Sequence, residues 1–301
     1  MTISVSSPGS VSATSTGSVP ASSPGSVSAT PPGSGSASTA LAALFSSVVA
    51  RLRAAGCVFA EDEARLLLAT GRTGDALAAL VERRANGLPL EHVLGWAEFC
   101  GHRISVDLGV FVPRPRTELL VRHARLLASR RAGAVVLDLC CGSGAAAAVL
   151  GAELPGIELY AADVEPAAVR CARRNVAPVG GRVYGGDLYA ALPDRLRGRV
   201  DVLVANAPYV PTDDIGLLPS EARDHEPLVA LDGGADGLDV QRRVTAGAAR
   251  WLAPGGSLLI ETSERQADRT VDAMVRGGLR ARAEEDEELG ATVVIGTLPR
   301  E

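Results

Sequence analysis

The sequence lacks several features that would each have indicated a class of protein. It contains no lysine, so arginine supplies every strong positive charge, and the formal net charge is -5. A chain with this balance has no general positive field, which disfavours direct binding to nucleic acid. No apolar run approaches the ~20 residues that a membrane span needs, so we expect no membrane attachment. The first charged residue is Arg51, so we expect no secretory signal either.

Cysteine and aromatic residues are also scarce. The five cysteines form no Cys-x-x-Cys pair and have no histidine at ligand spacing, so we expect buried thiols, no metal site and a reducing, cytoplasmic location. Aromatic residues make up 3% of the chain, which disfavours an aromatic-lined groove for single-stranded nucleic acid. Nothing in the sequence indicates an oligomeric state.

The composition and periodicity divide the chain into four parts. Residues 1–39 are almost wholly small or polar, with no charged or aromatic residue, and we expect a disordered low-complexity tail. Residues 40–97 show helical periodicity and predict a small helical domain. Residues 98–113 predict a linker hairpin, and residues 114–301 form the last and largest domain.

Strands and helices alternate in this last domain. The expected strands are 135–140, 158–164, 182–188, 200–205 and 257–262, followed by two strands, 280–287 and 291–298, with almost no connection between them. The alternation predicts an α/β fold with a mainly parallel sheet, and the last two strands must pair as an antiparallel hairpin. This combination is typical of class I methyltransferases rather than of dehydrogenases.

A glycine turn follows the first expected strand of the sheet. Residues 135–140 are apolar apart from Asp138 and run into Gly142, Ser143 and Gly144, after which an alanine-rich helix begins. Glycines at such a turn allow the backbone to approach a ligand closely. The spacing also matches a dinucleotide-binding turn, in which a helix N-terminus holds a pyrophosphate, so the turn alone leaves the ligand open.

Acidic residues end the next two expected strands. Asp163 lies where either cofactor class has its ribose hydroxyls bound, and Asp187 is placed to meet an adenine amine. With Asp138 they favour S-adenosylmethionine, which has a positively charged tail, over NAD; the alternative for Asp163 and Asp187 is a helix or turn cap. The residues that we assign to the cofactor are Asp138, Cys140, Cys141, Gly142, Ser143, Gly144, Asp163, Asp187, Leu188 and Asn206.

The tetrapeptide Asn206-Ala207-Pro208-Tyr209 follows the strand expected at 200–205. It presents a carboxamide, a backbone carbonyl and an aromatic face at one point, which suits the planar NH2 group of an amide or of a nucleobase. The alternative is an ordinary turn at the end of a strand, where Asn and Pro are common. We interpret residues 206–209 as the catalytic segment.

These motifs, in this order, resemble those of the protein-(glutamine-N5) methyltransferases of HemK type. The likeness runs from about residue 83 to the C-terminus and also includes Pro113-Arg114-Pro115-Arg116-Thr117-Glu118, Glu226-Pro227 and Gly233-Gly234-Ala235-Asp236-Gly237. The resemblance implies a Rossmann-like fold with a seven-stranded sheet, preceded by a helical domain that helps to hold the substrate. It implies S-adenosylmethionine-dependent methylation of a protein glutamine, in the Gly-Gly-Gln loop of a peptide-chain release factor. It also implies that Asn206 Oδ1 and the Ala207 carbonyl accept the N–H bonds of that glutamine, beside the ring of Tyr209.

The sequence departs from the family pattern at three positions. Ala207 replaces a proline, Cys140 replaces a glycine, and Thr292 stands where the family pattern has an arginine. These departures leave open an amino-methyltransferase that acts on a small molecule, and the Asn-x-Pro-Tyr motif by itself is shared with enzymes that act on nucleobases. A non-catalytic protein of the same fold would be expected to have lost Asp163 or Asn206, and both are present.

Overall fold

The computed structural model describes residues 34–300. Among the described residues, 44–300 belong to one compact unit and 34–43 to another. The low-complexity segment expected over residues 1–39 lies mostly outside the described residues. Helix α1 (Ser34–Ala54) begins ahead of Ala40, because serine and alanine propagate a helix that has already formed at little cost. The three boundaries between the four parts drawn from the sequence stay predictions.

Three short helices follow α1 and share a small apolar core with its second half. They are α2 (Ala60–Ala69), α3 (Gly74–Ala85) and α4 (Leu90–Leu94). Val49, Leu52, Leu67 and Val81 are among the buried residues of this core. The chain continues into a two-stranded antiparallel hairpin of β1 (Trp96–Phe99) and β2 (His102–Ser105).

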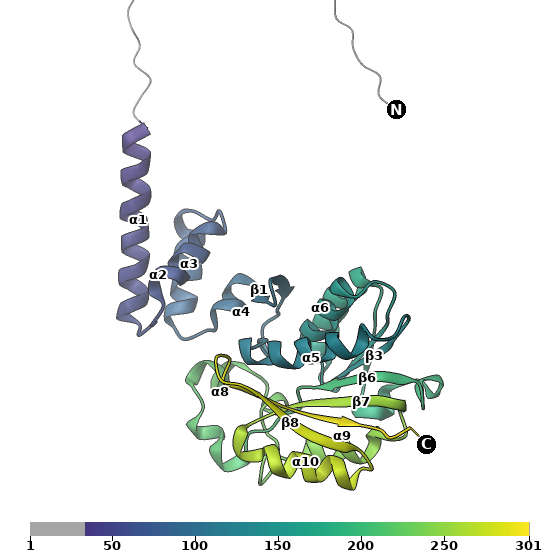
Figure 1. Ribbon diagram of the computed structural model, residues 1–301. Coiled ribbons are helices and arrows are strands. Elements are labelled where there is room, and N and C mark those ends of the chain that lie inside the picture. Colours follow the sequence, from purple (N-terminus) through teal and green to yellow (C-terminus); the bar gives the residue numbers. More distant parts are fainter. Residues whose placement is uncertain (1–33, 301) are drawn as a thin grey trace, which may run out of the picture. The chain divides into compact units, whose positions relative to one another are not determined.

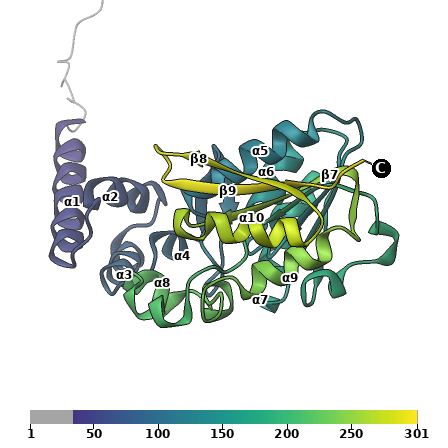
Figure 2. The same cartoon turned by 60° about the horizontal axis from the view of Figure 1, so that its bottom comes forward.

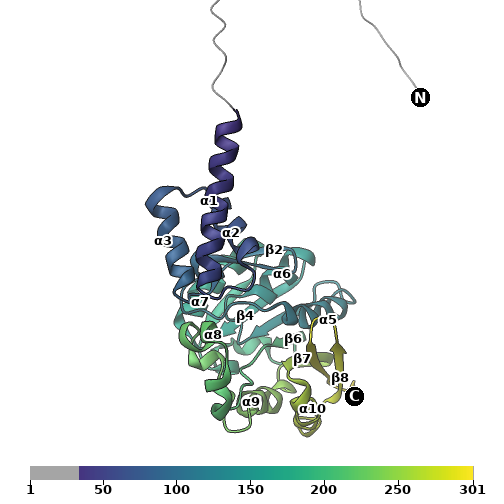
Figure 3. The same cartoon turned by 90° about the vertical axis from the view of Figure 1, so that its left-hand side faces the viewer.

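A buried arginine joins these helices to the rest of the unit. The Nε of Arg84, in α3, donates to Glu63 Oε2 of α2 at 2.6 Å, and its Nη1 lies 2.8 Å from Glu221 Oε1. Glu221 belongs to α8 (Ser220–His225), a short helix far along the chain. Figure 2 shows α3 and α8 side by side, and Figure 3 shows the same neighbourhood from another direction.

The remaining strands form the seven-stranded mixed sheet that the sequence predicts, in the order β5-β4-β3-β6-β7-β9-β8. Strands β3 to β7 are parallel to their neighbours, whereas β9 is antiparallel to both β7 and β8, so the predicted C-terminal hairpin is confirmed. The strands are β3 (Val135–Leu139), β4 (Glu158–Asp163), β5 (Arg182–Gly185), β6 (Val200–Ala205), β7 (Leu252–Thr262), β8 (Arg280–Asp286) and β9 (Ala291–Thr297).

Helices cover both faces of this sheet (Figure 1). The first face packs against α5 (Glu118–Ala128), α6 (Ala145–Glu153) and α7 (Pro166–Val176). The second packs against α9 (Asp239–Ala248) and α10 (Ala267–Arg276). Val202 and Val204 of β6 belong to the first core, and Leu203 and Ala205 to the second. This alternation follows from the two-residue period of a strand, and both faces of the sheet are buried from solvent.

Two expected strands differ from the observed ones by more than one residue. β5 ends at Gly185 rather than at Leu188, because Gly186 and Leu188 have φ of +149° and +45°, which no extended strand contains. β7 begins at Leu252, ahead of Ser257, because its first residues pair with the start of β6 across a register shift. Neither difference moves the carboxyl ends of β3, β4 and β6, where the predicted site residues lie.

Candidate active site

The loops at the carboxyl ends of β3, β4, β5 and β6 surround a cavity of about 760 Å³. Parallel strands place their carboxyl ends at one edge of a sheet, which is where open α/β folds bind ligands. Of the predicted site residues, those that line the cavity are Asp138, Cys140, Cys141, Gly142, Ser143, Asp163, Asp187, Leu188, Asn206, Ala207, Pro208 and Tyr209. Gly144 is the one predicted residue that does not line it.

Gly144 has a packing role instead of the ligand contact that we expected. Its φ is +75°, and a Cβ placed there would lie 2.9 Å from Val176 Cγ2 and 3.0 Å from Ala172 Cβ. Both neighbours belong to α7, so this glycine lets the start of α6 approach α7 closely. Gly142 differs, because a Cβ there would meet only Phe111 Cβ, at 3.9 Å, and the residue faces the cavity.

Two carboxylates hold the glycine turn in place. Asp163 Oδ2 accepts a hydrogen bond from the Gly142 N–H at 2.8 Å, and its Oδ1 accepts one from the Glu165 N–H at 2.9 Å. Asp138 Oδ2 accepts from the Ala147 N–H, in the first turn of α6, at 3.2 Å. Asp163 therefore combines a turn-capping role with a position on the cavity wall. Glu165, which the sequence analysis missed, also lines the cavity.

Asp187 is held differently from the other two acids. Its carboxylate is exposed and lies 2.5 Å from Arg243 Nη2, an arginine of α9 that also lines the cavity. The predicted contact of Asp187 with an adenine amine would therefore be made by a carboxylate that already has a cationic partner. Leu188, next to it, adopts a left-handed backbone with φ of +45°.

Cys140 also has a left-handed backbone, with φ of +56°. This is the position at which the family pattern has glycine, and a left-handed conformation is costly for any residue with a Cβ. Burial raises the pKa of the Cys140 and Cys141 thiols well above the ordinary range, so both are neutral at physiological pH. Cys141 is buried and Cys140 is partly buried, and both are small neutral side chains beside the turn, not nucleophiles.

Asp138 makes ligand binding and stability depend on pH in opposite directions. Burial raises its pKa from 3.8 to about 7. The folded protein then keeps a proton that the unfolded chain releases, so this group lowers the free energy of unfolding as the pH rises from 3.8 to about 7. Only the charged carboxylate, present above that pH, attracts a ligand's ammonium group.

We therefore expect Asp138→Asn, which keeps an acceptor for the Ala147 N–H, to be more stable than the parent at about pH 8. Its affinity for S-adenosylmethionine should be at least roughly tenfold lower there. In the parent, the affinity should fall as the pH drops through 7. Thermal unfolding and calorimetric titration check both expectations, and a parent affinity that stays flat across this window would contradict them.

The segment 206–209 turns at the end of β6 and lines the cavity. Asn206 Nδ2 donates to Thr117 Oγ1 at 3.2 Å. Among residues 34–300 nothing donates a hydrogen bond to Asn206 Oδ1 or to the Ala207 carbonyl. Ala207 is buried and has the same carbonyl as the proline that it replaces. One carboxamide oxygen and one carbonyl oxygen of residues that line the cavity thus have no donor among the described residues.

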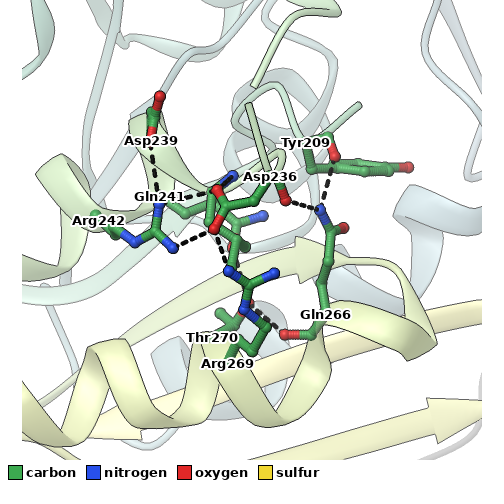
Figure 4. A network of polar contacts seen from close by, with 9 residues as sticks. Tyr209, Asp236, Asp239, Gln241, Arg242, Gln266, Arg269 and Thr270 are labelled. Atoms are coloured by element: carbon green, nitrogen blue, oxygen red, sulfur yellow. Dashed lines mark hydrogen bonds and ion pairs between the residues drawn. The ribbon is translucent and has the colours of Figure 1, made fainter. Parts of the chain in front are cut away.

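The turn is supported from behind by the Gly-Gly-x-Asp-Gly segment, as Figure 4 shows. Gln266 Nε2 donates to the Tyr209 carbonyl at 2.9 Å and to the Asp236 carbonyl at 3.1 Å. The Asp236 carboxylate is paired with Arg242 at 2.5 Å and also with Arg269, and these cations hold its pKa well below its usual range. This cluster ties the catalytic segment to the starts of α9 and α10.

The Pro-Arg-Pro-Arg-Thr-Glu and Glu-Pro segments meet beside the cavity. Glu226 is buried, and its Oε1 accepts from Arg114 Nη2 at 2.6 Å and from the Val112 N–H at 3.1 Å. Arg116 Nε donates to Glu261 Oε1 at 3.3 Å, and its guanidinium lies 5.7 Å from the centre of the Tyr209 ring. Each of these sequence motifs therefore contacts either the cavity or another motif that does.

Comparison with known proteins agrees with this geometry. The family described as Methyltransferase small domain matches residues 108–216. A release factor glutamine methyltransferase of Deinococcus radiodurans is 38% identical over 266 residues, which cover 82% of this chain and 94% of the relative. One from Geobacter sulfurreducens is 40% identical over 205 residues, covering 67% and 70%.

The chain is also similar to a methyltransferase with a small-molecule name and to a solved structure. A 4-amino-L-phenylalanine/4-methylamino-L-phenylalanine methyltransferase of Streptomyces pristinaespiralis is 42% identical over 193 residues, covering 62% of this chain and 65% of the relative. A solved structure of a release factor-specific protein-(glutamine-N5) methyltransferase from Alicyclobacillus acidocaldarius superposes with a TM-score of 0.38 at 26% identity, covering 62% of this chain and 94% of that one.

The sheet order, the antiparallel last strands and the matched family define the class: the protein is a class I methyltransferase, with S-adenosylmethionine as methyl donor. Relatives that match over two thirds or more of their length narrow this further. The chain belongs to the release factor glutamine methyltransferase family. None of the described helices is long and apolar enough to cross a membrane.

Proposed function

We propose that this enzyme methylates the side-chain nitrogen of a glutamine in a protein, and that the glutamine is the one in the Gly-Gly-Gln loop of a peptide-chain release factor. The observation that carries the proposal is the pair of free acceptors, Asn206 Oδ1 and the Ala207 carbonyl, on the wall of the cavity that also contains the glycine turn. The names of the relatives that match over two thirds or more of their length support the same substrate.

The bound methyl donor would be held by the turn and its acids. Asp138 offers a buried carboxylate to the ammonium group, the Gly142 turn offers a close backbone approach, and Asp163 or Glu165 offers acceptors to ribose hydroxyls. A buried carboxyl with a raised pKa suits a cationic ligand, which restores its charge. When bound, S-adenosylmethionine supplies a methyl group on a positively charged sulfur.

Positioning is the main task of the catalytic segment. An amide nitrogen is a poor nucleophile, because its lone pair is delocalised into the carbonyl. Asn206 Oδ1 and the Ala207 carbonyl accept the two N–H bonds of the glutamine and so orient its nitrogen toward the methyl donor. They also face the nitrogen as it becomes positively charged, which stabilises the transition state.

Tyr209 forms the side of this pocket and does not act as a base. Its hydroxyl donates to Glu261 Oε1 at 3.2 Å, and burial together with this carboxylate raises the pKa of the phenol above its ordinary value. The phenol therefore stays neutral, and its ring is left to pack against the amide plane of the substrate.

Mass spectrometry of a purified release factor, incubated with this enzyme and S-adenosylmethionine, tests the proposal. We expect the Gly-Gly-Gln peptide to gain the mass of one CH2 group on the glutamine, and no gain when that glutamine is replaced by glutamate. An unchanged peptide from an enzyme that binds the methyl donor would overturn the release-factor substrate.

A second candidate is methylation of a small aromatic amine, which the Streptomyces pristinaespiralis relative favours by its name. The replacement of the family proline by Ala207 makes the turn less rigid, and the same two acceptors suit any NH2 group. Incubation with 4-amino-L-phenylalanine in parallel with the release factor separates the candidates, because each reaction gives a methylated product of a different mass.

A further inference from the structure

Asn175 joins two segments near the cavity that are distant in the sequence, and the sequence analysis did not single it out. It lies near the C-terminal end of α7 and is partly buried. On one side of it is the glycine turn, whose Ser143 is buried and lines the cavity. On the other side is Ser105, the last residue of β2.

The carboxamide of Asn175 is engaged at both of its polar atoms. Its Nδ2 donates to the Ser105 carbonyl at 2.8 Å and to the Ser143 carbonyl at 2.8 Å. Its Oδ1 accepts from the Ser105 N–H at 3.0 Å. A carboxamide has two N–H donors and one carbonyl acceptor, so only this orientation satisfies the two carbonyls and the N–H together.

The β1–β2 hairpin that this carboxamide holds contributes to the cavity. Phe99, the last residue of β1, lines it. Val106, the residue after β2, is buried in an apolar cluster with Ala97 of β1 and Cys171 of α7. The hairpin is therefore packed on α7, and the glycine turn is packed on the same helix through Gly144.

We infer that Asn175 is a positioning residue for the methyl donor, and that through it the order of the glycine turn and the order of the hairpin depend on each other. The inference rests on the proposal that the glycine turn holds S-adenosylmethionine. It adds a connection between that turn and the part of the wall that carries Phe99.

The Ser143 carbonyl is the reason why one side chain has this effect. Among residues 34–300 no group other than Asn175 Nδ2 donates to it. A buried carbonyl that loses its donor is costly, so the native turn requires the carboxamide in place. The carboxamide is in turn oriented by the two bonds to Ser105. A ligand that binds only the ordered turn therefore also favours the docked hairpin, because coupling between two sites is reciprocal.

Two substitutions of Asn175 test the positioning role. Asn175→Asp keeps the shape and the acceptor for the Ser105 N–H, but its carboxylate donates to neither carbonyl. Asn175→Ala removes all three bonds. We expect the affinity for S-adenosylhomocysteine, measured by calorimetric titration, to fall about 10- to 100-fold in both variants. An affinity equal to that of the parent in both would overturn the positioning role.

Arg174→Gln is the matched control. Arg174 is the neighbour of Asn175 in α7 and pairs with Asp107, just beyond β2, at 2.5 Å, so it also joins α7 to the segment that follows the hairpin. It has no hydrogen bond to the glycine turn in the described part of the chain. Both members of this pair are about half exposed, so the affinity should stay within about twofold of the parent.

Hydrogen exchange measures the coupling without turnover. The Ser105 N–H is bonded to Asn175, and Ser105 does not line the cavity, so a ligand there acts on it only through the protein. In the parent, saturating S-adenosylhomocysteine should slow exchange at the Gly142 N–H and, by at least about tenfold, at the Ser105 N–H. In Asn175→Asp the slowing at Gly142 should remain and the slowing at Ser105 should vanish. In Arg174→Gln both should remain.

Equal slowing at Ser105 in the parent and in Asn175→Asp would overturn the coupling. The parent alone also decides it, even if a variant does not fold, because a Ser105 N–H whose exchange ignores the ligand contradicts the inference. S-adenosylhomocysteine that slows exchange at neither Gly142 nor Ser105 in the parent would contradict the proposed donor site itself, and the coupling with it.

Discussion

Replacing Asn206 with alanine is expected to lower kcat about 100- to 1000-fold, as the loss of one aimed polar group does in other active sites. The variant loses the carboxamide acceptor, and the Ala207 carbonyl alone cannot orient both N–H bonds of the substrate. The affinity for S-adenosylmethionine should change far less, because the turn and its acids remain. Single-turnover kinetics with calorimetric titration of the methyl donor separate the two quantities.

Two further variants test whether the loss of activity is due to the position of the Asn206 acceptor. Asn206→Gln keeps the carboxamide but moves it by one CH2 group, and it should be nearly as slow as the alanine variant. Asn86→Ala changes an exposed asparagine at the end of α3, and it should leave kcat unchanged. A fast Asn206→Gln enzyme would show that the placement of the acceptor does not matter.

Gly237→Ala is expected to lower the free energy of unfolding by about 2–4 kcal/mol and to abolish most of the activity. Gly237 has φ of +76°, and a Cβ there would lie 2.3 Å from both the Tyr209 carbonyl and Gln266 Nε2. The carbonyl belongs to the catalytic segment, so relief of the overlap must move that segment away from its position on the cavity wall. Chemical denaturation and kcat measure the two effects.

Gly278→Ala is the matched control for this substitution. Gly278 also has a left-handed backbone, with φ of +85°, but nothing lies within 4 Å of an added Cβ. It should cost only the backbone strain, about 1–2 kcal/mol, and leave kcat unchanged. If the two alanine variants were equally stable and equally active, the overlap at Gly237 would be absorbed without moving the catalytic segment.

Much of the fold follows from local pattern. The strand at 200–205 is observed with the expected bounds, and those at 135–140 and 158–164 each end one residue early, because apolar runs between glycine turns and helices have few other solutions. The C-terminal hairpin follows from its short connection. The predicted end of β5 was wrong, because no sequence signal indicates that Leu188 adopts a left-handed backbone conformation.

The site residues that directly follow or end a strand could be predicted from the sequence. Asp138, Asp163 and Asn206 lie on the cavity because parallel strands bring their carboxyl ends together. The role of Gly144 was not predictable, since it depends on the closeness of α7. Glu261 was missed for a related reason, because its contacts with Arg116 and Tyr209 join residues 145 and 52 positions apart and depend on the register of β7.

The Arg84 ion pairs bear on how this protein can be recombined with its relatives. Arg84 is buried between Glu63 and Glu221, and a buried charge that loses its partners costs about 3–5 kcal/mol. Glu221 also lines the cavity. The ion pairs of Arg84 therefore connect helices α2 and α3 to one wall of the candidate active site. A chimaera that takes the helices of residues 44–94 from one protein and α8 from another could lose the ion pair between residues 84 and 221. The helices of residues 44–94 and the α8 part of the cavity wall are therefore expected to be exchanged together.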